Sequence, residues 1–212
     1  APVGAESMAM SGAHVVSTVI IAPLGAVSMA AHALAITAES LCYMPGYGIA
    51  AAASTLVGQS IGARDYRLAR RYGYITVAFG SAVMALTGII MYFACPLVFG
   101  MLTPVEEVRI VAAQILRIGL LAEPLFGAAM VASGALRGAE DTLVPSILNL
   151  LSMWVVRLGL ALTLVPLYGI HGMWMAMATE LCVRGILMLC RLMRSGHMRC
   201  DLVKEENTRQ KS

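Results

Sequence analysis

Seven charged residues lie inside or beside long apolar stretches of this sequence, where they could exchange ions or contact a polar substrate. They are Glu6, Glu39, Arg117, Glu123, Arg157, Glu180 and Arg184. A charge at membrane depth costs about 3 kcal/mol or more, so such residues usually mark an ion or substrate path. A carboxyl group in a low-dielectric cavity also holds its proton to higher pH, which suits it to proton exchange.

Each of these residues also has a purely structural interpretation. Glu39 and Arg184 fall near the ends of expected helices, where a long side chain can reach the membrane surface. Arg157 and Glu180 lie deeper and could form an ion pair inside a helix bundle. We therefore keep Glu39, Arg157 and Glu180 as a candidate intramembrane charge network, with the structural pair as the alternative.

Other chemistry finds little support. The stretch LVGQSIGARDYRLARR (56–71) lacks the Lys followed by Ser or Thr that a nucleotide-binding loop needs, and its arginines lack the aromatic interleaving of a nucleic-acid surface. Gly58 and Gly62 are spaced for close contact with another helix. The histidines and cysteines show no metal-ligand spacing, and no nucleophile–base arrangement is evident. We expect neither an enzyme nor a nucleic-acid partner.

The elements that position these charges are membrane helices. The chain has 212 residues, of which 59% are hydrophobic and 13% charged, about half the charged fraction of a soluble domain. Each apolar segment is long enough for a helix that spans the bilayer. The expected segments are Ser7–Leu24, Ser40–Gly62, Tyr72–Phe99, Val108–Gly134, Leu143–Leu164 and Ile170–Met193. The predicted fold class is all-α, a polytopic membrane protein with six transmembrane helices and the lipid bilayer as its surroundings.

Basic residues alternate between the connections of these segments. They gather after the second segment, after the fourth and in the tail, whereas the other connections have none or, near Arg109, have neighbouring acids. This pattern predicts that the basic connections and both chain ends face the cytoplasm. Residues 194–212 form a polar tail that we expect to be disordered.

The second segment contains helix breakers. Pro45 removes one backbone donor, and Gly46 and Gly48 loosen the backbone beside it. The sequence predicts a helix kink here, of the kind that lines cavities in transporters.

Several motifs are similar to those of one family. AAHALAITAESLCYMPGYGIAAAASTLVGQSIGARD (30–65) resembles the C-terminal half of multidrug and toxin extrusion (MATE) transporters, and SGALRGAEDTLVP (133–145) resembles a later loop of the family, with Glu140 where Gly is usual. SMWVVRLGLA (152–161) and PLYGIHGMWMAMATE (166–180) match as well. The resemblance implies that residues 1–193 form helices seven to twelve of a twelve-helix fold, and that an N-terminal six-helix lobe is missing.

The resemblance also implies a function. The family exports organic cations and amphipathic drugs by alternating access, driven by Na+ or H+, with no other cofactor, and here in a plasma membrane of the bacterial inner-membrane type. Aligning IAPLG (21–25) with the family puts Glu6 where the NorM-like branch binds a cation, which makes Glu6 a candidate Na+ ligand. That branch also uses an aspartate near the position of Phe126, and Glu123 is the available substitute.

We thus expect Glu6 and Glu123 to couple cation flow to export. Two alternatives stay open. A lipid-linked sugar flippase of the same superfamily would share the fold, and a non-transporting membrane scaffold would tolerate neutralisation of its deep acids.

Overall fold

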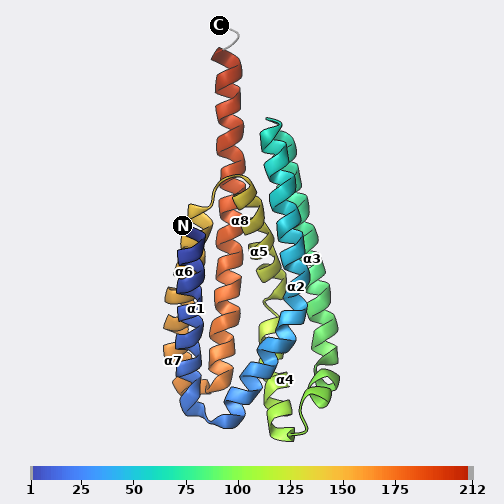
Figure 1. Cartoon of the computed structure of the whole chain (residues 1–212), viewed down its shortest axis with the longest axis vertical. Coiled ribbons are helices and arrows are strands. Elements are labelled where there is room, and N and C mark those ends of the chain that lie inside the picture. The colour runs from blue at the N-terminus through green and yellow to red at the C-terminus, as the bar shows by residue number, and fades with distance from the viewer. Residues whose placement is uncertain (1, 210–212) are drawn as a thin grey trace.

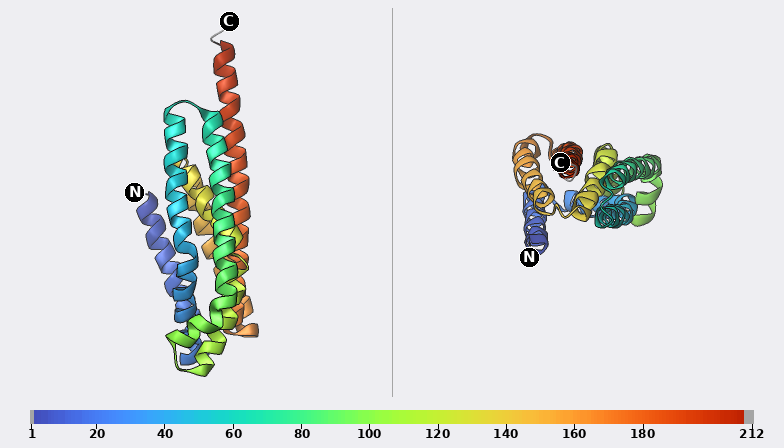
Figure 2. Two further views of the ribbon diagram at one scale, coloured as in Figure 1. Left: turned by 90° about the vertical axis from the view of Figure 1, so that its right-hand side faces the viewer. Right: turned by 90° about the horizontal axis from the view of Figure 1, so that it is seen from above.

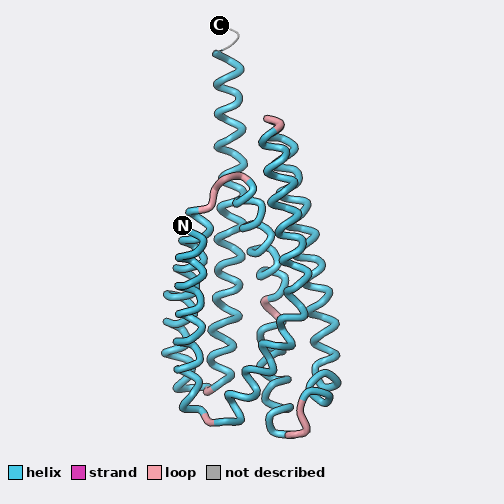
Figure 3. Tube along the Cα trace, in the orientation of Figure 1, coloured by secondary structure: helices cyan, strands magenta, loops and turns pink. Residues whose placement is uncertain are grey.

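The computed structural model describes the backbone of residues 2–209 and the side chains of residues 8–194. The described chain is helical almost throughout and contains no strand (Figure 3). This confirms the all-α fold class. The elements are α1 (Pro2–Ile21), the short 3-10 turn η1 (Ala22–Leu24), α2 (Ala26–Gly62), α3 (Tyr66–Leu102), α4 (Glu106–Leu120), α5 (Glu123–Gly138), α6 (Leu143–Leu151), the π-helical segment η2 (Ser152–Arg157), α7 (Leu158–Tyr168) and α8 (Ile170–Arg209).

The predicted apolar segments become six antiparallel rods, two of which are interrupted (Figure 1). The fourth rod is the pair α4 and α5, bent by 55° at a break. The fifth is α6 and α7, joined through η2 without a turn. Seen from above, α1, α6 and α7 lie on one side of the molecule, while α2, α3 and α5 lie on the other (Figure 2). α8 packs against both groups.

Local sequence explains where the rods reverse. Gly25 (φ 96°) and Gly169 (φ 59°) adopt backbone angles that other residues disfavour, and they turn the chain before α2 and α8. Asp65 caps α3 by accepting a 2.9 Å hydrogen bond from the Leu68 amide. Pro124 stands in the first turn of α5, where its missing amide costs nothing.

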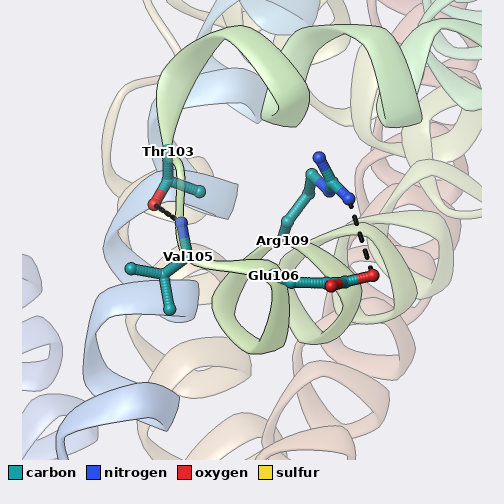
Figure 4. A network of polar contacts seen from close by, with 4 residues as sticks. All are labelled: Thr103, Val105, Glu106 and Arg109. Carbon is teal, nitrogen blue, oxygen red and sulfur yellow. Dashed lines mark hydrogen bonds and ion pairs between the residues drawn. The ribbon is translucent and has the colours of Figure 1, made fainter.

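The connections sort by charge as the sequence predicts. The α2–α3 and α5–α6 connections lie at the end of the bundle that holds the C-terminus (Figure 1). The α3–α4 connection lies at the opposite end, where Arg109 forms a 3.8 Å ion pair with Glu106 and the Val105 amide donates to Thr103 Oγ1 (Figure 4). Which end faces the cytoplasm stays a prediction.

Three predicted boundaries are wrong. α2 begins at Ala26 instead of Ser40, because Glu39 is buried inside the lobe and does not mark an exit to water. The segment Val108–Gly134 is not one helix, since it breaks between Leu120 and Glu123. α8 continues to Arg209, so the backbone of 194–209 is helical where composition predicted disorder.

Fewer than six of the rods are both long enough and apolar enough to count as membrane spans. Within the described residues, three helices qualify on their own: Tyr66–Leu102, Leu143–Tyr168 and Ile170–Arg194. The bent pair α4 and α5 qualifies as a fourth if it counts as one span, and Met8–Leu24 is apolar but shorter. The remaining rod, α2, is long enough, yet it is rich in alanine and glycine and carries the buried Glu39.

Helices α2 and α5 touch backbone to backbone. A Cβ atom on Gly134 would collide with the Ala50 carbonyl, and one on Gly138 would collide with the Ser54 carbonyl. Gly58 lies in the same row, and a Cβ atom on Gly58 would lie 3.4 Å from the Gly138 carbonyl oxygen. We call this contact the α2–α5 seam; its residues are Ala50, Ser54, Gly58, Gly134 and Gly138. The predicted packing role of Gly58 is thus confirmed, whereas Gly62 faces open space.

Candidate functional site

A cavity of about 570 Å³ lies between the two groups of helices. Its walls come from α1, α2, α5, α6, η2 and α8, so it draws on both groups of helices and on α8 between them. Its lining mixes apolar, aromatic and charged side chains: Met10, His14, Ile36, Glu39, Tyr43, Tyr47, Ala50, Ala51, Ser54, Phe126, Ala129, Met130, Ser133, Gly134, Arg137, Asn149, Met153, Arg157, Met177, Leu181 and Arg184. A space of this size suits a drug-sized molecule.

Glu123 stands at the first position of α5, directly after the break in the fourth rod. It is 1% exposed, and neither carboxylate oxygen has a hydrogen-bond partner in the part of the chain whose side chains the structure describes. Its side chain packs against α3, where a Cβ on Gly88 would lie 3.3 Å from the Glu123 Cβ. The helix N-terminus places the positive end of the backbone dipole beside this carboxyl group.

Glu39 is the second deep carboxyl group. It is 6% exposed, lies midway along α2 and lines the cavity. Its side chain reaches α4, where a Cβ atom on Gly119 would lie 3.3 Å from Glu39 Oε1. Glu39 and Glu123 are within electrostatic range of each other. The structure therefore brings together two of the predicted acids from different helices.

The ion pair between Arg157 and Glu180, which the sequence left open as an alternative, gives way to a different pair. Glu180 is fully buried and pairs with Arg184 one turn along α8, at 3.2 Å from Arg184 Nε to Glu180 Oε1. Arg157, on η2, instead donates a weak hydrogen bond from Nη1 to Met153 Sδ at 3.6 Å. It stays within electrostatic range of both Glu180 and Glu39. Arg184 lies well inside α8 and not near a helix end as predicted.

Two further residues singled out in the sequence, Glu6 and Arg117, are not among the described residues that line the cavity. The backbone of Glu6 belongs to α1, but its side chain lies outside the described residues, so its role as a Na+ ligand stays a prediction. Among the described side chains, no three His, Cys, Asp or Glu residues gather around a metal position. Arg117 lies outside the cavity lining, with its guanidinium carbon 5.1 Å from the centre of the Tyr92 ring.

The predicted kink lies within α2, which changes direction along its length (Figure 1). Pro45 is inside this helix. Gly46 is buried where a Cβ would meet the sulfur atoms of Met84 and Met130, whereas Gly48 faces open space. Gly46 thus has a packing reason to be glycine, and assigning the bend to Pro45 stays a prediction.

Sequence reasoning missed two histidines. His14 lines the cavity from α1. His32, on α2, accepts a 3.1 Å hydrogen bond at Nδ1 from Trp174 Nε1 of α8, and both side chains are buried. The sequence does hold a signal for the second contact, because a buried tryptophan needs an acceptor for its N–H. Nothing in the spacing identifies which residue supplies that acceptor.

Comparison with known proteins decides the family. The MatE family model matches residues 2–163, which is most of the chain. This chain belongs to the MatE family. It is 32% identical over 199 residues to a probable multidrug resistance protein NorM from Deinococcus radiodurans, covering 91% of this chain and 44% of that protein. A protein of the same description from Chromobacterium violaceum is 35% identical over 196 residues, covering 85% of this chain and 40% of the other.

Solved structures agree with the fold. The Vibrio cholerae MATE transporter VcmN in its bent form superposes with a TM-score of 0.87 at 16% identity, over 93% of this chain and 45% of that one. The chain therefore spans less than half the length of the MatE relatives that it matches. It is a membrane protein that belongs to a family of transporters and not of enzymes. The prediction of a single MATE lobe is confirmed.

Proposed function

We propose that this chain forms the C-terminal half of a multidrug antiporter that couples drug export to the inward flow of Na+ or H+. The observation that carries the proposal is the burial of Glu123 at the start of a half-helix. Its two carboxylate oxygens have no hydrogen-bond partner among the described residues, it is 1% exposed, and it begins a half-helix at a break in the rod. Broken helices whose ends face ion or substrate sites are a recurring feature of secondary transporters.

Glu39 supports the coupling role. Because the two carboxyl groups are within electrostatic range, binding a proton or Na+ at one stabilises negative charge at the other. Glu39 also lines the cavity, so a change in its charge is felt by any molecule bound there. Glu6 is the third coupling group that we propose, on the family resemblance alone.

The proposed transport cycle needs a second lobe, because the cavity of this lobe is only part of a substrate path. We propose that the partner is an N-terminal six-helix lobe, that the two rock by alternating access in a bacterial plasma membrane, and that the C-terminus is cytoplasmic. Proposed substrates are organic cations or amphipathic drugs. The similarity to probable multidrug resistance proteins NorM supports multidrug export.

The test uses the complete gene product in a drug-sensitive strain without its own exporters. We expect Glu123→Gln to lower dye efflux at least about tenfold, and Glu39→Gln to lower it as well, since neither amide can exchange a proton. Glu107→Gln, an exposed acid in the first turn of α4, is the matched control and should change nothing.

Two outcomes would contradict parts of this proposal. Unchanged efflux in Glu123→Gln would remove the coupling role of that residue. Absence of efflux from every form, for a panel of cationic and amphipathic dyes, would remove drug export and favour the flippase or scaffold alternatives. Comparing efflux with and without Na+ at constant pH identifies the coupling ion.

A further inference from the structure

Arg157 is a buried cation that makes no ion pair with any side chain that the structure describes. It lines the cavity yet is only 5% exposed, and its Nε has no hydrogen-bond partner among those side chains. It donates a hydrogen bond to Met153 Sδ at 3.6 Å, which is a weak acceptor. Taking a guanidinium out of water costs several kcal/mol unless a counter-charge and hydrogen bonds compensate for it.

The nearby acids do not supply that counter-charge by direct contact. Glu180 is committed to Arg184 at 3.2 Å. Glu39 lies within electrostatic range of Arg157, but no ion pair joins the two in the described part of the chain. The cavity lining as a whole carries three arginines and one glutamate. Because Arg184 is paired with Glu180, Arg157 is the lining cation to which an anionic group of an occupant could bind.

Aromatic side chains stand beside this basic wall. The guanidinium carbon of Arg184 lies 5.3 Å from the centre of the Phe126 ring. Tyr43 contacts the same ring edge to face, at 6.0 Å between centroids. All three side chains line the cavity, so a flat apolar ligand would find a stacking surface there.

We propose that Arg157 binds the anionic group of an amphipathic aromatic molecule, with a carboxylate, sulfonate or phosphate facing its guanidinium fork and the rings of the molecule against Phe126 and Tyr43. A planar guanidinium suits such oxyanions because it donates parallel hydrogen bonds to two oxygens. This inference rests on the proposed function and narrows its proposed substrates, organic cations and amphipathic drugs, to amphipathic molecules that carry a negatively charged group.

The experiment measures equilibrium binding of two dyes with the same xanthene core, anionic fluorescein and cationic rhodamine 123, to the purified complete gene product. We expect the unaltered protein to bind fluorescein at least about tenfold more tightly. Arg157→Gln should weaken fluorescein binding about tenfold or more and leave rhodamine binding unchanged or stronger. Arg157→Lys should fall between, because it keeps the charge but loses the fork.

Arg109→Gln is the matched control, since it removes an arginine that lies outside the cavity. Equal fluorescein affinity in Arg157→Gln and the unaltered protein would overturn the proposal. If Arg157→Gln does not fold, the dye affinities of the unaltered protein decide. Tighter binding of fluorescein than of rhodamine supports the proposal. Equal affinities, or tighter binding of rhodamine, overturn it.

Two further arms separate the explanations. Binding in detergent needs no ion gradient, so fluorescein binding without efflux would overturn antiport and leave the anion site standing. Titration in nanodiscs with and without phosphatidylglycerol distinguishes a lipid phosphate from a free solute. If the lipid displaces fluorescein from the unaltered protein but not from Arg157→Gln, the site binds a lipid headgroup. If the lipid displaces no fluorescein, the site binds the soluble anion.

Discussion

The α2–α5 seam and the cavity adjoin each other along the same two helices but are built in contrasting ways. At the seam, the glycines of α5 bring two backbones into direct contact and leave no room for a side chain. Around the cavity, α1, α6, η2 and α8 leave a space beside α2 and α5, and charged and aromatic side chains line it. Ala50, Ser54 and Gly134 belong to both regions, whereas Gly58 and Gly138 lie outside the cavity lining.

This contrast separates two kinds of constraint. In lipid, helices associate through close packing of small residues, so the seam must be shape-complementary and cannot tolerate added atoms. Buried charges around the cavity cost stability and are retained where they bind ions or substrate. We therefore expect substitution of Gly138, a seam residue outside the cavity lining, to act on folding alone, and substitutions at the cavity to act on folding and transport separately.

The largest effect on stability is expected at the ion pair beside the cavity. Arg184→Met leaves the fully buried Glu180 without its partner and should lower the free energy of unfolding by about 3–5 kcal/mol. Replacing both residues with Met should restore most of this loss, because no unpaired charge then remains. Unfolding by SDS titration of the purified complete gene product measures both changes.

The double variant also tells structure from function. If the pair serves only packing, the double variant regains both stability and efflux; if Arg184 contributes to transport, it regains stability alone. A double variant as unstable as Arg184→Met would contradict the assignment of the loss to an orphaned Glu180. Arg109→Met, whose pair with Glu106 is largely exposed, should change stability by less than about 1 kcal/mol.

A smaller effect is expected at the seam. Gly138→Ala forces its new Cβ against the Ser54 carbonyl and should cost about 1–3 kcal/mol through backbone displacement. Gly48→Ala is the matched control on α2, since nothing lies within 4 Å of its Cβ direction and alanine favours a helix. Thermal denaturation followed by size-exclusion fluorescence compares the two. Equal stability of both variants would contradict a close-packed seam.

The sequence was sufficient to predict the helical rods, because a membrane helix is recognisable from the local run of apolar residues that forms it. Runs of apolar residues and the alternation of basic connections predicted the rods and their order, and the motif near Gly58 predicted a close helix contact. The boundary at Ser40 failed because a carboxyl group was interpreted as an exit to water. Glu39 is instead covered by α4, and which helix covers a residue is decided by tertiary packing.

The site was only partly predictable for the same reason. Glu39, Glu123, Arg157 and Glu180 were recognisable because charges in apolar surroundings stand out. The pair of Glu180 with Arg184 also had a local signal, because residues four apart lie on the same face of a helix, whereas the alternative partner Arg157 comes from another rod. Side-chain direction around a helix, and the break before α5 that sets the position of Glu123, follow from packing that no local pattern records.

The smallest effect is expected outside both regions, at the end of the bundle that holds the C-terminus. Arg191 of α8 contacts Asp141 Oδ2 of the α5–α6 connection through Nη2 at 2.7 Å and Nε at 2.9 Å. Both side chains are partly exposed, so solvent and salt screen the pair, and Asp141→Asn should cost about 1 kcal/mol or less.

Efflux by Asp141→Asn should equal that of the unaltered protein, because this contact touches neither the seam nor the lining of the cavity. Adding salt to the unaltered protein should reproduce part of the stability loss, since added ions weaken the same attraction. Loss of efflux at unchanged stability would instead mean that the α5–α6 connection moves during transport, and the division of the lobe into a packed seam and a working cavity would then have to include this end.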